Sequence, residues 1–280
     1  MDHRALIASR CPFLEVRTCE PIGDGWTCDT YLVDGAWIAQ VPRSPYAADR
    51  LRTQLTILPE LASELSTAVP DPEPSVLDGD PPLLVYRRID GAAAADAPDG
   101  IWPERLGRLL YDLHSVPPEF LGLRAMGSGA IREDRPRAWG ELADVVLPLL
   151  GPAERERARA MLRMALDDDD LWTFAPVVTH GDLGPEHVLV DEAGDLAGVI
   201  DWEEVSIEDP AGDLAWWLHA MPDVGERALA AYGGAPDRRF RERARILFAL
   251  MPWHEVRHGV EGGGEAFVAS GLDGVRERLV

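Results

Sequence analysis

The 280-residue chain contains no lysine and no asparagine, so all 27 of its basic residues are arginines. The missing lysine excludes enzymes that form a Schiff base through a lysine side chain, among them the pyridoxal enzymes. It also excludes the GxxxxGK[ST] phosphate-binding loop, whose lysine contacts the phosphates. A nucleotide-binding site in this chain must therefore obtain its positive charge from arginine or from a metal ion.

Cysteine is scarce and long apolar runs are absent. Cys11, Cys19 and Cys28 are too few for a disulfide framework, and no histidine cluster accompanies them as in a zinc site. No stretch approaches the roughly 20 consecutive apolar residues that a membrane-spanning helix needs. The N-terminus also lacks the charged and apolar regions of a secretory signal. We therefore expect a cytoplasmic protein with free thiols.

The charge balance is strongly acidic, with 49 acids against 27 bases and a formal net charge of −22. Such a chain repels nucleic acids and anionic membranes, so we expect neither as a partner. The charge favours small cationic ligands, although an acidic surface also serves solubility. A hydrophobic fraction of 46% is enough for one large core or two packed lobes. We also expect the protein to be a monomer or a weak homodimer.

The first ninety residues are rich in predicted strands. Residues 30–33 and 37–41 flank Asp34 and Gly35, a pair of residues typical of a tight hairpin turn. The pattern predicts a helix over residues 47–64, which Pro59 should bend or break. Prolines at 70, 72 and 74 predict an extended connector, and residues 83–86 a further buried strand.

Beyond residue 91 the pattern becomes mainly helical. Apolar residues at positions 106, 109, 110 and 113 predict one buried helix face, and residues 161–165 indicate another helix. Short apolar strands are predicted at residues 177–179, 188–190 and 196–200, with a turn over residues 191–195. Helices are predicted again from Ala211 onward.

Two acidic residues each follow one of these predicted strands. Residues 180–190 read HGDLGPEHVLV, which places Asp182 directly after the first strand, and residues 198–202 read GVIDW, which places Asp201 after the third. Loops that follow buried strands commonly converge on ligand sites. Phosphoryl transfer needs such a pair, because one carboxylate orients the attacking hydroxyl and another holds magnesium against the triphosphate.

This layout resembles the HGDxxxxN catalytic loop and the IDW metal motif of the aminoglycoside phosphotransferases, antibiotic kinases that resemble protein kinases. The resemblance implies that Asp182 is the catalytic base, that Asp201 is the main Mg²⁺ ligand and that His180 anchors the loop. Residues 209–215 match the family's DPAxDLA segment, in which Asp213 hydrogen-bonds back to the catalytic loop.

The resemblance covers most of the chain. It implies an α+β, protein-kinase-like fold with a small β-rich N-terminal lobe (residues 1–88) and a larger helical C-terminal lobe (residues 89–280). It implies ATP or GTP together with Mg²⁺ as cofactors. Gly23 and Gly25 would form the turn that approaches the phosphates, and the hinge residues Tyr86 and Arg88 would meet the nucleotide base.

The sequence departs from the family pattern at three positions. Position 187 carries His187 in place of asparagine, as in the macrolide phosphotransferases, and His187 either binds the metal or orients a water or Asp182. Gln40 stands where the phosphate-binding lysine is expected, and Gln54 where its glutamate partner is expected. The pair exchanges an ion pair for two amides beside the nucleotide. Three consequences are open. A nearby arginine such as Arg43 replaces the lost positive charge, magnesium carries more of the charge, or the chain binds nucleotide weakly.

Acidic residues near the catalytic loop are candidates for gripping a cationic acceptor. We expect substrate binding by Glu203, Glu204, Asp209 and Glu255, with a helix cap as the alternative role of Asp209. The function that follows is transfer of a γ-phosphoryl group to a hydroxyl of a small cationic antibiotic, either an aminoglycoside, a cationic peptide antibiotic or a macrolide. Two alternatives are a catalytically silent protein that binds drug or nucleotide, and a metabolite kinase of the choline or homoserine type.

Overall fold

The computed structural model describes residues 2–23, 25–73, 79–123 and 127–279. Its N-terminal part is built on one antiparallel sheet with the strand order β1-β2-β3-β4. The strands are β1 (Cys19–Pro21), β2 (Cys28–Val33), β3 (Trp37–Pro42) and β4 (Leu84–Arg87). The predicted hairpin is confirmed, because β2 pairs with β3 and the two turn residues Asp34 and Gly35 both have positive φ (50° and 69°).

Helix α1 (His3–Arg10) precedes this sheet and was not predicted from the sequence. Its buried residue Ile7 belongs to a small outer core that also contains Val33, Val41 and Val85 from three of the strands. The alternating side chains of a strand point to opposite faces of a sheet. The outer face of the N-terminal sheet is therefore covered by its own helix.

Helix α2 (Pro45–Glu64) begins two residues before its predicted start. The Ser44 side chain caps it by accepting a hydrogen bond from the Ala47 N–H at 3.1 Å, and Pro45 occupies the first turn, where its missing N–H costs nothing. Pro59 does not break the helix, which continues through it to Glu64, and the alternative expectation of a bend at Pro59 stays a prediction. Its buried apolar face contributes to the central core.

The C-terminal part combines two small sheets with several helices. One sheet has the order β5-β7-β8 and the other pairs β6 with β9. The strands are β5 (Ala92–Ala93), β6 (Val177–Thr179), β7 (Val188–Val190), β8 (Leu196–Val199) and β9 (Ser206–Glu208). The helices are α3 (Trp102–Ser115), α4 (Ser128–Val146), α5 (Pro152–Leu166), α6 (Ala211–Ala220), α7 (Pro222–Ala231), α8 (Phe240–His258) and α9 (Glu265–Arg278).

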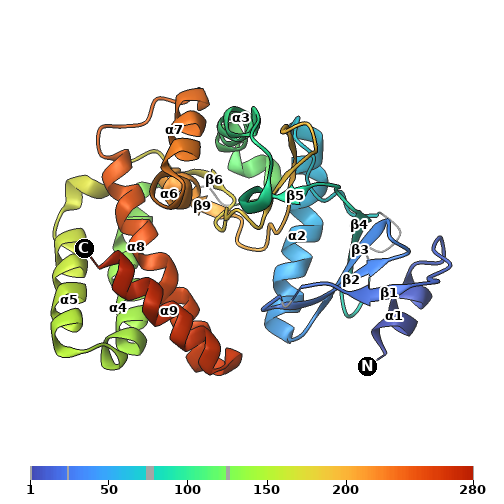
Figure 1. Cartoon of the computed structure of the whole chain (residues 1–280), viewed down its shortest axis with the longest axis horizontal. Coiled ribbons are helices and arrows are strands. Elements are labelled where there is room, and N and C mark those ends of the chain that lie inside the picture. Colours follow the sequence, from blue (N-terminus) through green and yellow to red (C-terminus); the bar gives the residue numbers. More distant parts are fainter. Residues whose placement is uncertain (1, 24, 74–78, 124–126, 280) are drawn as a thin grey trace.

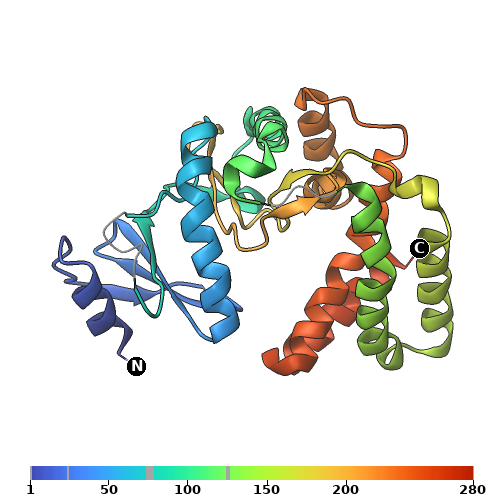
Figure 2. The same cartoon turned by 180° about the vertical axis from the view of Figure 1, so that it is seen from behind.

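The elements form an elongated molecule, with the N-terminal sheet at one end and helices α4, α5, α8 and α9 at the other (Figure 1). Helices α2 and α3 and the strands β7 and β8 lie between these ends, as the view from behind also shows (Figure 2). The central core crosses the predicted lobe boundary at residue 88, since it joins Leu51 and Tyr86 to Leu106 and Trp217. The boundary itself stays a prediction.

The connector between α2 and β4 fastens the two parts of the molecule together. Ala68 forms an isolated bridge with Gly198 of β8, and Pro72 forms one with Tyr86 of β4. The extended character predicted from Pro70 and Pro72 agrees with these bridges, whereas Pro74 lies outside the described residues. Within the described ranges, no helix is both long enough and apolar enough to cross a membrane.

Candidate active site

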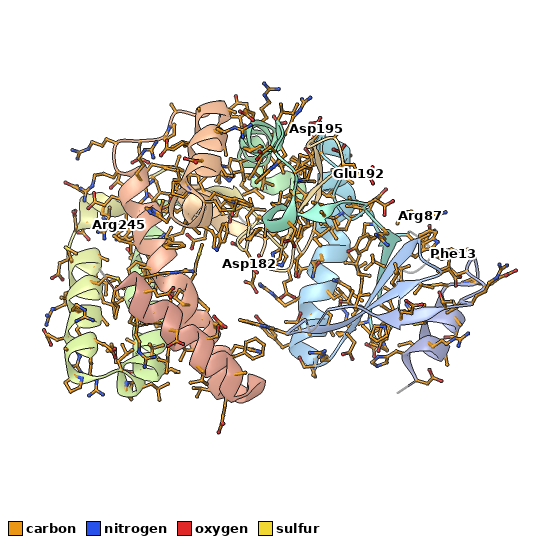
Figure 3. The ribbon with its side chains drawn as sticks, in the orientation of Figure 1. Phe13, Arg87, Asp182, Glu192, Asp195 and Arg245 are labelled. Carbon is orange, nitrogen blue, oxygen red and sulfur yellow. The ribbon has the colours of Figure 1, made fainter. Side chains whose placement is uncertain are left out.

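The catalytic-loop sequence lies between β6 and β7, and Asp201 follows β8. Figure 3 shows Asp182 near the middle of the molecule, between the N-terminal sheet and helices α8 and α9. The loop is tied to Asp201 through the backbone, because the Ile200 N–H donates to the His187 carbonyl at 2.9 Å. Asp201 itself has a φ of 65°, a left-handed conformation that is uncommon for a residue other than glycine. Such strained residues cluster at functional sites.

Asp213, in the first turn of α6, holds the start of the catalytic loop. Its carboxylate accepts hydrogen bonds from the backbone N–H of His180 at 2.9 Å and of Gly181 at 3.0 Å. The same carboxylate accepts a third bond from Nε2 of the buried His114 at 3.1 Å. Burial raises the pKa of Asp213, but the His114 hydrogen bond and the other donors outweigh it and leave the pKa lowered. Asp213 is therefore an ionised anchor for the loop.

His180 is fully buried and supports the loop from within. Its Nε2 donates to the Ile200 carbonyl at 3.0 Å, which leaves Nδ1 to accept the Asp182 N–H at 3.3 Å. The imidazole also packs on the Trp202 ring, with 4.6 Å between the ring centroids. Burial lowers the pKa of His180, so the ring is neutral and links the loop to the residues after β8 that carry Asp201.

Asp182 presents its carboxylate to solvent, with the side chain 62% exposed. Burial of the surrounding site raises the pKa of Asp182 to about 6, with a further contribution from the negative charge of Asp201 and an opposing one from His187. Because so much of the side chain is open to water, solvent screens part of this effect. A carboxylate with this pKa near neutrality is suited to accept a proton from a hydroxyl.

His187 connects the two acids of the site. Its Nδ1 donates to the Asp182 carbonyl at 2.7 Å, and this bond directs Nε2 toward Asp201, 3.4 Å from the carboxylate. Burial lowers the pKa of His187, but Asp201 and the Asp182 carbonyl raise it by more, so the net shift is upward. The His187 ring is therefore placed either to form an ion pair with the Asp201 carboxylate when the ring is protonated, or to bind the same ligand as Asp201.

The donor set fits one face of a magnesium ion. Mg²⁺ prefers oxygen ligands and commonly takes only one or two protein carboxylates, the rest coming from water and phosphates. Asp201 supplies such a carboxylate, 38% exposed, while the His187 nitrogen is a softer and less suitable ligand. Among the described residues no group of three or more His, Cys, Asp and Glu side chains forms a closed metal cage. Asp201 would hold the ion, and His187 would support it.

The segment that precedes β2 and contains Gly23 and Gly25, here called the glycine-containing segment, is connected to the catalytic part of the molecule. Arg43 fixes this segment, because its guanidinium donates to the Gly25 carbonyl and pairs with Asp29 at 2.8 Å. Gly23 has a φ of 69°, which a glycine adopts freely. The Thr27 hydroxyl donates to the Glu203 carboxylate at 2.5 Å. Burial and the charge of Asp201 together raise the pKa of Glu203 to about 7, against the opposing effect of Thr27.

Glu204 makes a second contact between the N-terminal and catalytic parts. Its carboxylate pairs with the Arg50 guanidinium of α2. The Glu204 backbone lies against the catalytic loop, since a Cβ on Gly181 would fall 2.3 Å from the Glu204 carbonyl oxygen. Gly181 also has a φ of 86°, so only glycine suits this position. Two of the four predicted acceptor-binding acids, Glu203 and Glu204, therefore lie beside the catalytic loop and bind N-terminal residues in this structure.

A stack of aromatic rings joins the glycine-containing segment to the C-terminal helices. Trp26 lies parallel to His258 of α8, with ring centroids 3.9 Å apart, and meets Phe267 of α9 edge-on at 5.5 Å. Trp26 is 44% exposed, so the contact covers one face of the indole only. Together with the contacts of Thr27 and Arg50, this stack connects the two sides of the site.

Four residues that were predicted to contact the nucleotide differ in their burial and in their partners. Gln40 is half-buried on β3, and Gln54 is buried on α2, but no hydrogen bond joins the two amides among the described residues. Tyr86 is only 4% exposed, and its hydroxyl pKa is raised by burial and by the charge of Asp201. Arg88 pairs with Asp90 at 3.0 Å. Nucleotide contacts of these four residues stay predictions, and the buried Tyr86 offers its backbone rather than its ring.

The prediction that Asp209 binds the acceptor is wrong. Asp209 is 2% exposed, and its carboxylate accepts a 2.6 Å hydrogen bond from Nε of the fully buried Arg243. It also caps α6 by accepting the Ala211 N–H at 3.0 Å, which is the alternative role predicted from the sequence. Both carboxylate oxygens are thus occupied by the core, and none is available to a ligand.

Glu255 is half-buried on α8, where its charge acts on Arg278 of α9. The neighbouring His254 is exposed on α8, and burial of its ring atoms and the charge of Arg257 lower its pKa against the opposing charge of Glu204. Acceptor binding by Glu255 stays a prediction. His254, Thr27 and Arg50 are residues of the site that the sequence did not reveal, because each meets it from a distant segment.

The fold and the site together define a protein-kinase-like phosphotransferase. A β-rich N-terminal part meets a helical C-terminal part, and the loops at their junction present one open carboxylate and a second one beside an imidazole. The sequence pattern described as the phosphotransferase enzyme family, APH, matches residues 18–247. The chain belongs to this family.

Individual relatives agree with this assignment. Viomycin phosphotransferase of Streptomyces vinaceus is 33% identical over 258 residues, which cover 84% of this chain and 85% of the relative. The GDP and kanamycin complex of APH(2")-IIIa has the same fold, with a TM-score of 0.84 over 99% of this chain and 97% of that chain at 20% identity. Macrolide 2'-phosphotransferase MphH of Brachybacterium faecium gives a TM-score of 0.71 at 25% identity, covering 98% of each chain.

Proposed function

We propose that this protein transfers the γ-phosphoryl group of ATP or GTP to a hydroxyl of a small cationic antibiotic. The observation that carries the proposal is the position of Asp182, an exposed carboxylate with a raised pKa on a loop that Asp213 anchors. His187, at the end of the same loop, lies 3.4 Å from the Asp201 carboxylate. This pairing of an open acid with a cation-binding acid supports phosphoryl transfer.

In the reaction, Asp182 accepts a hydrogen bond from the acceptor hydroxyl and orients its oxygen toward the γ-phosphorus. The new bond joins that oxygen to phosphorus as the bond between the γ-phosphorus and the β,γ-bridging oxygen breaks. The hydroxyl proton passes to Asp182 and the nucleoside diphosphate leaves. Asp201 would hold a magnesium ion, which would neutralise charge on the phosphate oxygens. His187 contacts both the Asp182 backbone carbonyl and the Asp201 carboxylate, and so fixes the position of one relative to the other.

The acceptor class is inferred from charge. The negative charges of Asp201, Glu186 and Glu204 act on Asp182 and contribute to its raised pKa. Such surroundings attract an acceptor that carries amines and disfavour an anionic one. The relative that acts on viomycin favours a cationic peptide antibiotic among the acceptors to be tried. Aminoglycosides and macrolide sugars carry a hydroxyl and an amine as well, and they belong in the same panel.

A direct test incubates the purified chain with magnesium, ATP or GTP and a panel of cationic peptide antibiotics, aminoglycosides and macrolides. Mass spectrometry should detect one acceptor that gains ~80 Da, the mass of one transferred phosphoryl group. Choline, homoserine and an amino sugar test the metabolite-kinase alternative in the same assay. If no acceptor gains mass although one binds measurably, the chain is a silent binding protein and the proposal fails.

A further inference from the structure

The nucleotide side of the site lacks the lysine that its chemistry calls for. Asp182, Asp201, Glu203 and Glu204 are all acidic, so a bound triphosphate would meet four carboxylates in its neighbourhood. One magnesium ion does not balance this charge. The chain contains no lysine, and Gln40 is neutral, so an arginine from another element must provide the missing positive charge.

Most arginines near the N-terminal sheet are committed elsewhere. Arg43 pairs with Asp29 and holds the Gly25 carbonyl, which fixes the glycine-containing segment itself. Arg88 pairs with Asp90, and Arg87 lies over the Trp37 ring at 3.9 Å. Among the described residues, Arg50 is the one arginine that pairs with an acid of residues 202–205, the stretch between Asp201 and β9.

Arg50 lies beside the residues that follow Asp201 and close to the catalytic loop. Its partner Glu204 packs its backbone on Gly181, next to Asp182. The charge of Glu203, which accepts the Thr27 hydroxyl, also acts on Arg50. The Arg50 side chain is 30% exposed, so one of its faces is open to a ligand. Its Nε–H is buried and has no hydrogen-bond partner, so the guanidinium is only partly satisfied by Glu204.

We propose that Arg50 binds the phosphates of the nucleotide, taking the place of the absent lysine, and that it exchanges the Glu204 carboxylate for phosphate oxygens when the nucleotide binds. The inference rests on the proposed function and adds the residue that carries its nucleotide affinity. A guanidinium presents a rigid fork of donors that matches phosphate oxygens. The exchange also frees Glu204 to meet a cationic acceptor, which is the role predicted for it from the sequence.

The test compares equilibrium binding of a triphosphate and of its nucleoside. The triphosphate is whichever of MgATP and MgGTP the wild-type chain binds more tightly, measured by calorimetry. Arg50→Gln should weaken triphosphate binding by about tenfold or more, the effect of losing one charged hydrogen-bonding group, and should leave nucleoside binding unchanged. Arg50→Lys should give an affinity between those of the wild type and of Arg50→Gln, because it retains the charge but loses the fork of donors.

Arg52→Gln is the matched control, since Arg52 lies on the same helix but pairs outward with Asp49 and Asp80. Triphosphate affinity in this variant should equal that of the wild type. Equal weakening of nucleoside and triphosphate by Arg50→Gln would show a general structural role and overturn the inference. Unchanged triphosphate affinity would overturn it too, while leaving the proposed function intact. A wild-type chain that binds no nucleotide would remove the proposed function, and the role of Arg50 with it.

The proposed exchange, in which phosphate oxygens replace the Glu204 carboxylate on Arg50, is tested by a separate binding measurement. Glu204→Gln should tighten triphosphate binding by about threefold, the usual worth of a partly exposed ion pair, because the competing carboxylate is lost. The gain should shrink in the Arg50→Gln background, where no guanidinium remains to be released. An identical gain in both backgrounds would mean that Glu204 acts on the nucleotide through its charge alone, and the exchange would be wrong.

Discussion

Asp213 accepts the backbone N–H of Gly181 at 3.0 Å, and this bond fixes the residue immediately before Asp182. The carboxylate is 1% exposed and accepts donors from three residues, so it is surrounded by partners and has no contact with a substrate. The geometry of Asp182 therefore depends on a buried residue of α6 that lies 32 positions after Gly181 in the sequence. Catalysis and stability are coupled at this point.

Replacing Asp213 should cost both stability and activity. Asp213→Ala leaves the N–H groups of His180 and Gly181 and the His114 imidazole without their acceptor, so we expect the free energy of unfolding to fall by about 3 kcal/mol or more. Urea unfolding at neutral pH measures this change. Asp144→Ala, at an exposed acid on α4, is the control and should change stability by less than about 0.5 kcal/mol. Equal stability of the two variants would contradict the anchoring role.

Asp213 also predicts how stability depends on pH. Its pKa is lowered in the folded state from an ordinary value of 3.8, so the unfolded chain binds a proton at this residue more readily. Its contribution is therefore fully present above the ordinary pKa and is lost as the pH falls through the lower folded value. Below about pH 4, the free energy of unfolding of Asp213→Asn should decline less steeply than that of the wild type. Parallel acid limbs would show that Asp213 titrates alike in both states.

The ion pair of Arg243 and Asp209 should matter far more than an exposed pair on the same helix. Arg243→Met leaves the buried Asp209 charge without a partner, which typically costs about 3–5 kcal/mol. Arg241 pairs with Glu226 at the surface, and Arg241→Met should cost less than about 1 kcal/mol. Chemical denaturation of both variants measures the difference. Similar losses would mean that Asp209 finds another partner or is not charged.

The cysteines should differ in their reactivity toward a thiol reagent. Burial raises the pKa of both Cys11 and Cys28 to about 11, and both side chains are almost fully buried. Cys19 is half-exposed on β1, and its pKa is raised less. Because the thiolate is the reactive form, Cys19 should react first with DTNB at pH 8, and the other two only on unfolding. Peptide mapping identifies the modified residue, and early labelling of Cys28 would contradict the packing described.

Local patterns in the sequence were enough to predict the parts of the fold that depend on neighbouring residues. The Asp34–Gly35 hairpin follows from turn chemistry, and the catalytic loop with Asp182 and Asp201 follows from the strands that carry them. Helix α4 was missed, because its buried face includes the charged Arg135 and its interior contains Pro136, both of which obscure the apolar period. The pattern of residues along a segment cannot show such burial.

Contacts between distant segments could not be predicted in the same way. Asp209 and Glu203 are both acids of one short stretch, yet Asp209 is buried against Arg243 while Glu203 binds Thr27 across 176 positions of sequence. Which acid is buried depends on what the rest of the chain packs against it. The pairing of Arg50 with Glu204 has the same origin, and it became apparent only from the folded structure.

The central claim is that Asp182 accepts the proton of an acceptor hydroxyl during phosphoryl transfer. The most direct measurement is the rate of acceptor phosphorylation by Asp182→Asn, with Glu192→Gln as control at an exposed acid in the β7–β8 turn (Figure 3). We predict that Asp182→Asn lowers kcat by about 10²–10⁴-fold, the usual contribution of a positioned general base, and keeps nucleotide affinity, while Glu192→Gln stays active. A kcat for Asp182→Asn close to that of the wild type would contradict the account.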